Sequence, residues 1–273
     1  MDEINLTSSI RENLLSLQHA SQVREQSAQH LATGRKVNSA VEEPASFFAA
    51  KGLLDRAQGL AEAKDDIDQA ISAVEAASVG TEALSEIAKQ MRGIAMSARG
   101  GTDEQRQAAS ERYDALRNQL DQLAKDITYN GVNVVKPESD DLEVDLSESG
   151  SFVVTIEGQD SGAEGLAINT SSFYNNFATD EDIDGANAQL REATQTLRSN
   201  AASLGSDVAL LSDRKEFVVS LSNTLEDGAA KLVVADMNEE AATQLSSQLR
   251  QQLSLSTLQV TGEHARSLTQ LMS

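Results

Sequence analysis

Apolar residues recur at helical spacing near both ends of this chain. At the front they follow gaps of four and three, and at the back they follow gaps of four. Such spacing places side chains on one face of a helix. We therefore predict a helix at each end, and we assign these residues to an assembly face: Ile10, Leu14, Leu17, Leu245, Leu249, Leu253, Leu268 and Leu271.

Each of these terminal helices has an apolar stripe but no aromatic residue, so neither builds a globular core alone. The stripes need a partner. The terminal helices can pair with each other, with copies of themselves, or both. The pattern indicates assembly rather than catalysis.

A long helical run follows Pro44 in the sequence. Ile67, Ile71 and Val74 keep a four-three spacing, which continues until Gly100-Gly101 ends the run. The segment from Thr102 to Gln105 is a plausible helix start. We predict that two helices form a hairpin here.

After Pro137 the spacing of the apolar residues changes from the helical period to strict alternation with polar residues. The turn signal Tyr129 to Val132 comes first, and two short alternating runs at 142–146 and 152–156 then fit an antiparallel β-hairpin. Gly, Ser and Asp are frequent up to Asp182. From Ile183 a helical pattern resumes, with leucines at intervals of seven: Leu190, Leu197, Leu204 and Leu211.

These elements define a fold class. We predict a mainly α protein, an elongated antiparallel helical bundle or coiled coil with paired terminal helices and a small β-hairpin insert. The composition agrees, because aromatic residues are only 3% of the chain and Trp is absent. Long helices that pack side by side through small residues have such a composition.

Charge and candidate chemistry narrow the function. The net charge is −21, and the chain has no basic patch, so we expect neither nucleic acid nor membrane as a partner. The histidines His19, His30 and His264 lie outside any nucleophile-and-carboxylate pattern. Asp236, Glu239 and Glu240 lack the spacing of a calcium loop. We expect no enzyme activity, cofactor or metal.

The first residues do not form a secretory signal. They are acidic where a signal peptide is basic, and a continuous apolar segment is missing. Zero cysteines are compatible with either a reducing or an oxidising compartment. We therefore expect that export, if it occurs, follows another route.

Three segments together resemble the bacterial flagellins, in particular the alphaproteobacterial branch. They are LATGRKVNSAVEEPASFFAAKGLLDRA at 31–57, ITYNGVNVV at 127–135 and LEDGAAKLVVADMNEEAATQLSSQLRQQL at 225–253. The resemblance implies an inner domain of residues 1–34 plus 238–273 and a helical rod of 35–136 plus 180–237. It also implies a short variable insert at 137–179, exposed on the filament, in place of the large outer domains of some flagellins.

The resemblance also implies a function. A flagellin is a structural subunit that self-assembles into the flagellar filament for swimming motility, so the main partner is the chain itself. The family implies secretion through the flagellar type III export machinery, with an export chaperone, and contacts with junction and cap proteins. The expected location is the extracellular flagellum.

Two further surface sites are expected, the first from the resemblance and the second from the exposure of the insert. The innate-receptor epitope of the family falls by position on Lys89, Gln90, Met91, Arg92 and Ile94. Gln90 replaces an expected arginine and Gly93 an expected glutamate, so we expect weak or absent receptor recognition. Ser171 and Ser172, in the insert, are candidate acceptors of O-linked sugar.

Two alternatives remain open at this point. A hook-filament junction protein shares the terminal helices and an acidic-Pro pair like Glu43-Pro44. A soluble signalling coiled coil of the chemoreceptor type shares the heptads, but it should lack the central hairpin and the Asn130-Gly131 turn.

Overall fold

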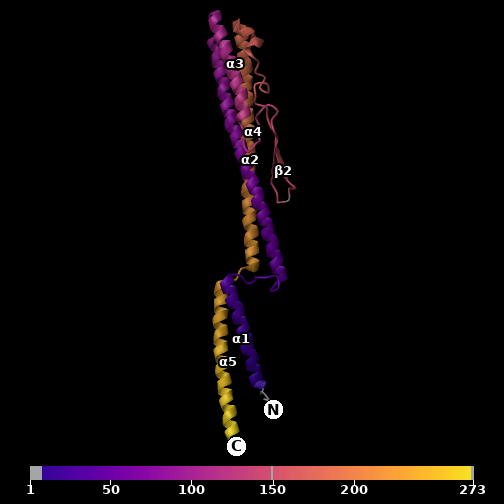
Figure 1. Ribbon diagram of the computed structural model, residues 1–273, viewed down its shortest axis with the longest axis vertical. Helices are drawn as coiled ribbons and strands as arrows, with labels where there is room; N and C mark the ends of the chain where they lie inside the picture. Colours follow the sequence, from indigo (N-terminus) through magenta and orange to yellow (C-terminus); the bar gives the residue numbers. More distant parts are fainter. Residues whose placement is uncertain (1–7, 149, 272–273) are drawn as a thin grey trace. The chain divides into compact units, whose positions relative to one another are not determined.

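The computed structural model describes residues 8–148 and 150–271 (Figure 1). It confirms a mainly α protein with long packed helices and a small two-stranded sheet. The elements are α1 (Ser8–Thr33), α2 (Pro44–Ser97), α3 (Asp103–Asp126), β1 (Leu142–Asp145), β2 (Val153–Ile156), the 3-10 segment η1 (Ser171–Phe177), α4 (Asp180–Val233) and α5 (Met237–Leu271).

The described chain divides into two compact units. One unit contains the residues up to Asp55 together with those from Thr224 onward, and the other contains Arg56–Asn223. Helices α2 and α4 each contribute to both units. The predicted inner domain, rod and insert concern the assembled protein, and that division stays a prediction.

The unit Arg56–Asn223 has a core built from the heptad positions of its helices. The four leucines of α4 at intervals of seven are all buried, as are Leu84 and Met91 of α2 and Leu120 of α3. Each such side chain contributes roughly 1.5–3 kcal/mol when fully buried. The heptad pattern in the sequence therefore identified the core faces of these helices correctly.

Local sequence signals determine where α3 begins and where the chain turns after it. Thr102 accepts a hydrogen bond from the Gln105 backbone, and the Gln105 side chain accepts one from the Thr102 backbone, so the predicted helix start is a capping box. After α3, Asn130 and Gly131 have φ angles of 48° and 86°. Tyr129 and Val132 exchange two backbone hydrogen bonds of 3.0 and 2.9 Å, which confirms the predicted tight turn.

The predicted β-hairpin is present. Strands β1 and β2 pair antiparallel, with Leu142 opposite Ile156 and Val144 opposite Val154. Val144 and Ile156 are buried, whereas the intervening acidic residues of β1 face solvent. The hairpin is held to α4 by Arg214, which donates two hydrogen bonds to the Leu146 carbonyl, at 2.8 and 3.2 Å.

The second half of the predicted insert differs from the expected exposed loop. Ala163, Leu166, Ile168, Tyr174 and Phe177 are buried in the same core as α2, α3 and α4. The physical reason is that this segment packs along α3. Arg117 of α3 donates to the Ile168 carbonyl at 2.8 Å, and the Phe177 ring lies edge-on to Tyr113 of α3, with the ring centroids 5.3 Å apart. The sequence did not reveal η1, which lies in this segment.

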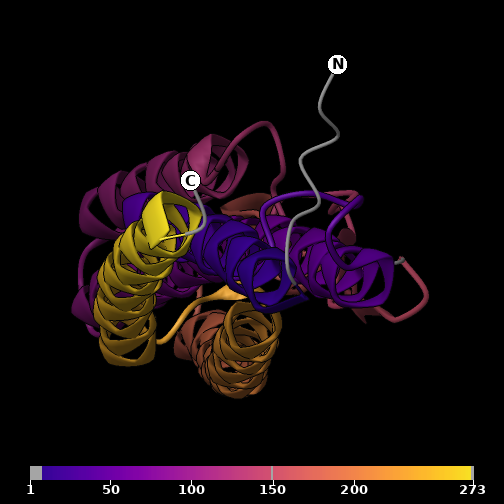
Figure 2. The ribbon, with the colours of Figure 1, turned by 90° about the horizontal axis from the view of Figure 1, so that it is seen from below.

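The other unit contains α1 and α5, which lie side by side and antiparallel (Figure 1 and Figure 2). The connector after α1 is joined to the end of α4, since Lys36 N donates to the Val233 carbonyl at 2.8 Å. Val37, Ala50, Ala229 and Val233 form a small buried cluster in this unit. The prediction that the terminal helices pair with each other is confirmed.

Candidate assembly interface

Helix α5 contacts α1 through a heptad of mostly polar residues. The buried or half-buried positions of α5 recur at gaps of four and three, as in a coiled-coil seam. They are Glu240, Gln244, Ser247, Gln251, Ser254, Leu258 and Thr261. The buried or half-buried positions of α1 include Ile10, Asn13, Leu17, Ala20, Arg24, Ser27, His30 and Leu31. The seam therefore buries mainly small and polar groups.

The leucines of α5 lie elsewhere. Leu245, Leu249 and Leu253 are 60%, 52% and 68% exposed. At about 100° per residue they lie on the face of α5 opposite the seam, together with Val260, which is also exposed. We name this set the leucine face. Ile10, Leu14 and Leu17 of α1, by contrast, are half-buried.

The reason for this difference is the position of the leucines around the helix. Leu249 lies two residues from both Ser247 and Gln251, which is about 200° around the helix from each, so it points away from α1 when those two residues face it. The polar residues keep the four-three alternation of a coiled-coil seam. The possibility that Leu245, Leu249 and Leu253 pair with α1 is thus wrong for the single chain. Leu268 and Leu271 lie outside the residues whose side chains the structure describes.

A hydrogen bond between side chains joins α1 to α5 within the seam. His30 Nδ1 lies 2.6 Å from Glu240 Oε1, and the two side chains are only 9% and 18% exposed. Burial raises the pKa of Glu240, but hydrogen bonds from His30 and Ser27 outweigh burial and hold that pKa below its ordinary value. Glu240 also lies in the first turn of α5, where the helix dipole favours a carboxylate.

The receptor-like patch on α2 is only partly at the surface. Lys89, Gln90 and Arg92 are exposed and Ile94 is half-buried, but Met91 is fully buried. Met91 occupies a heptad position that faces the core of α2, α3 and α4. It therefore cannot be read by a receptor at this surface, and its place in the patch was wrong.

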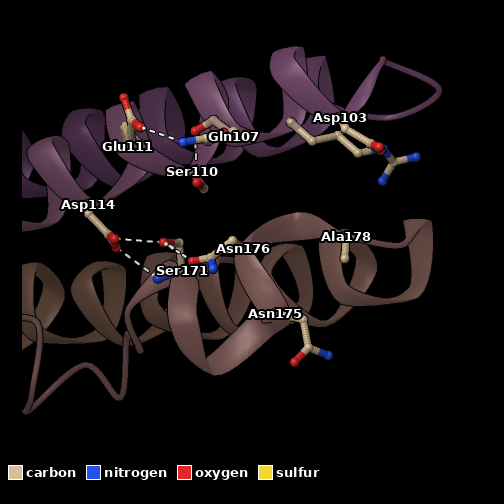
Figure 3. Close-up of a pocket in the computed structure, with 10 residues that line it drawn as sticks. Asp103, Gln107, Ser110, Glu111, Asp114, Ser171, Asn175, Asn176 and Ala178 are labelled. Carbon is tan, nitrogen blue, oxygen red and sulfur yellow. Dashed lines mark hydrogen bonds between the residues drawn. The ribbon is translucent and has the colours of Figure 1, made fainter.

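The two candidate glycan acceptors have different environments. Ser171 is buried, and its hydroxyl donates to Asp114 at 2.6 Å while its backbone N donates to the same carboxylate at 2.8 Å (Figure 3). This serine anchors η1 to α3 and is a poor acceptor. Ser172 is exposed, so its role as an acceptor stays a prediction.

A polar cavity of about 400 Å³ lies beside that contact, between α3 and η1 (Figure 3). Arg106, at one side of it, donates to the Phe177 carbonyl at 2.9 Å and to Asp180 at 2.7 Å. The arginine holds the pKa of Asp180 below its ordinary value. These groups are occupied in closing the loop, as Asp114 is occupied by the Ser171 hydroxyl and backbone N.

The residues that the structure describes were predicted to hold no metal and to span no membrane. Within them, no group of three or more His, Cys, Asp or Glu side chains is arranged to hold a metal ion. Among the helices that the structure describes, none combines the length and apolarity needed to span a bilayer.

Paired terminal helices with an uncovered leucine face are typical of a protein that assembles through its helices. Comparison with known proteins shows which family the chain is similar to. The family model described as bacterial flagellin N-terminal helical region matches residues 4–138. Flagellin FljM of Caulobacter vibrioides is 32% identical over 157 residues, which are 57% of this chain and 56% of that protein.

Other proteins to which the chain is similar are also flagellins. Flagellin FljK of Caulobacter vibrioides is 28% identical over 156 residues, with the same two shares of 57% and 56%. Flagellin D of Rhizobium meliloti is 32% identical over 159 residues, which are 53% of this chain and 39% of that protein. Over about half of its length the chain is similar to the flagellins, a family of structural proteins, and the predicted alphaproteobacterial resemblance is confirmed.

The chain spans about half the length of the curated relatives that it matches first. Among solved structures, the crystal structure of Bacillus cereus flagellin is similar, with a TM-score of 0.46 and 18% sequence identity. The similar region covers 56% of this chain and 88% of that chain. A structural similarity with so low a TM-score does not bear on the family.

Proposed function

We propose that this chain is a structural subunit that self-assembles into the bacterial flagellar filament and serves swimming motility. The observation that carries the proposal is the leucine face of α5, which no described part of the chain covers although α5 already pairs with α1. A line of half-exposed leucines gains free energy when another copy buries it. The similarity to flagellins makes a second copy the natural partner.

The remaining parts of the proposal follow from the family. The chain acts without catalysis, and it is secreted through the flagellar type III machinery into the extracellular flagellum. An export chaperone, junction proteins and cap proteins are its further partners. Ser172 and the exposed residues Lys89, Gln90 and Arg92 lie on surfaces available to a glycan or a receptor.

The alternatives are less well supported. A signalling coiled coil was expected to lack the central hairpin and the Asn130-Gly131 turn, and the structure contains both. The relatives reported above are flagellins, which favours the filament subunit over the junction protein.

The substitution Leu249→Asp tests the proposal. It removes roughly 1.5–3 kcal/mol of leucine burial per subunit and adds the cost of desolvating a carboxylate at a copy-to-copy contact. We expect the purified variant to stay monomeric under conditions in which the unaltered chain forms filaments, as measured by electron microscopy and sedimentation.

The matched control is Gln248→Asp, which introduces the same charge at an exposed position on the flank of α5. This variant should polymerise. Circular dichroism should show the same helix content for both variants, because Leu249 makes no core contact in the single chain. Normal filaments from Leu249→Asp would show that the leucine face is not an assembly surface.

A further inference from the structure

Asn130 is the one asparagine in the sequence that is followed by glycine. The two residues form the tip of the turn after α3, with φ angles of 48° and 86°, and both are exposed. The backbone hydrogen bonds of this turn join Tyr129 to Val132, so they leave the nitrogen of Gly131 unoccupied. A Cβ at Gly131 would meet nothing within 4 Å, so the space around that nitrogen is open.

The side chain of Asn130 is held weakly. Its Nδ2 donates to Gln69 Oε1 at 3.3 Å, and both residues are exposed. A long hydrogen bond between exposed side chains is readily replaced by bonds to water. The amide group of Asn130 can therefore rotate until its carbonyl carbon lies against the nitrogen of Gly131.

Asn133 and Asn200 show what protects an asparagine. Asn133, in the same loop, is buried, and its side chain donates to two carbonyls of α3 and accepts from two backbone N–H groups, at distances from 2.8 to 3.2 Å. Asn200 lies inside α4, where the nitrogen that follows it is hydrogen-bonded by the helix itself. Asn130 has neither protection.

We propose that Asn130 is a deamidation site, at which the chain modifies itself with water as the co-reactant. The nitrogen of Gly131 loses its proton and attacks Cγ of Asn130, so a C–N bond forms. The Cγ–Nδ2 bond then breaks, and Nδ2 leaves as ammonia with the proton that the attacking nitrogen lost. The resulting succinimide ring is opened by one water molecule at either of its two carbonyls, which gives aspartate or isoaspartate at position 130.

Both products add charge to a groove between α2, the turn and β1. The groove has a volume of about 380 Å³, and Asn130 lines it together with Asp66, Glu143 and Asp145. Among the described residues that line it, none is lysine or arginine. A new carboxylate at position 130 therefore adds to a repulsion that no cation of the groove offsets.

Isoaspartate also changes the backbone, because the chain then runs through the side-chain carbon and is one atom longer. The two hydrogen bonds between Tyr129 and Val132, at 3.0 and 2.9 Å, depend on the unaltered length of the turn. We expect the amides of the turn and of β1 to exchange faster with solvent after the modification.

Peptide mass spectrometry on the full soluble chain tests the site. The purified chain is incubated at neutral and at mildly alkaline pH, and samples taken over time are digested and fragmented. We expect Asn130 to exchange its NH2 for OH before any other asparagine does, and part of the product to be isoaspartate. The rate should rise about tenfold for each pH unit, because the attacking form of Gly131 is the deprotonated amide. Asn133 is the internal control from the same loop and should keep its amide.

Gly131→Ala is the matched variant. Its methyl group lies beside the attacking nitrogen and obstructs the approach to Asn130, so we expect the isoaspartate product to be lost over the same time. The φ angle of 86° strains an alanine, and circular dichroism of the variant therefore accompanies the measurement, with unchanged helix content expected.

Any of four results would reject the proposal: an Asn130 that stays intact while the urea-unfolded chain reacts at this position, a product with aspartate but no isoaspartate, an equal rate at Asn133, or an unchanged rate in Gly131→Ala. The first would mean that the folded turn protects the amide, and the second that water hydrolyses it directly. The reaction occurs within one chain and is measured on the monomer, so its outcome does not depend on whether the leucine face drives polymerisation.

Discussion

Gly80, inside α2, is required by a close contact with the end of α3. A Cβ at this position would lie 2.6 Å from Ile127 Cγ1. Gly93 lies in the same helix, but a Cβ there would meet nothing within 4 Å. The two glycines therefore have opposite consequences when a methyl group is added.

We expect Gly80→Ala to destabilise the unit Arg56–Asn223 by about 1–3 kcal/mol, the usual cost of overpacking. Gly93→Ala should instead stabilise it by up to about 1 kcal/mol, because alanine is the better helix former. Urea unfolding of both variants measures the difference. Equal stability of the two variants would mean that Ile127 moves away without cost.

Glu240 makes the α1–α5 pair sensitive to acid. The pKa of this carboxyl is held below its ordinary value in the folded chain by His30 and Ser27, against the opposing effect of burial. A lowered pKa contributes stability that is present above the ordinary carboxyl pKa of about 4.3 and is lost as the pH falls through the folded value.

We expect the helix content of the terminal pair to fall in that acid range, as followed by hydrogen exchange or circular dichroism. Glu240→Gln cannot titrate, so its pair should respond less to acid over the same range. An identical acid response in both proteins would assign the effect to other carboxyls.

At the scale of elements, the β-hairpin depends on one arginine of α4. Arg214 donates to the Leu146 carbonyl and lies over the rings of Phe152 and Phe217, 5.4 and 4.9 Å from their centroids. Its guanidinium thus combines a charge-assisted hydrogen bond with cation–π contacts. Lysine cannot reproduce the planar fork.

We expect Arg214→Ala to loosen the hairpin while the helices stay folded. Backbone amides of β1 and β2 should exchange faster with solvent, by roughly tenfold to a hundredfold if the contacts contribute about 1.5–3 kcal/mol. Arg191→Ala, at an exposed position of the same helix, is the control and should leave these amides unchanged. Unchanged exchange in Arg214→Ala would show that other contacts, such as the buried Val144 and Ile156 and the Arg56–Glu148 ion pair, hold the hairpin.

At the scale of the whole molecule, net charge governs association. Each chain carries 43 acidic and 22 basic residues, so subunits that approach one another repel. The Debye length shortens from about 30 Å at 0.01 M to about 8 Å at 0.15 M salt, which screens the repulsion at the distances where copies meet.

We therefore expect the critical concentration for polymerisation to fall as sodium chloride rises from low to physiological concentration. Sedimentation of polymer at each salt concentration measures it. A critical concentration that stays flat or rises would mean that specific ion pairs between subunits dominate the electrostatics.

Local patterns in the sequence determined most of the helices and turns. The heptads placed Leu190, Leu197 and Leu84 in the core, and the Thr102 and Asn130 signals marked a helix start and a turn, because spacing, capping and positive φ act within a few residues. The apolar stripes indicated the pairing of the ends, and the family resemblance added the expected function.

Only the tertiary structure decided which faces those elements bury. The leucines of α5 are more apolar than Ser247 and Ser254, yet the serines face α1, because heptad spacing and the partner at Glu240 select the seam and hydrophobicity alone does not. In the same way, Ser171 and Met91 resembled surface residues until their neighbours were known. Whether a residue is buried depends on which residues lie opposite it in space. Those neighbours are far away in the sequence, so the local sequence pattern does not identify them.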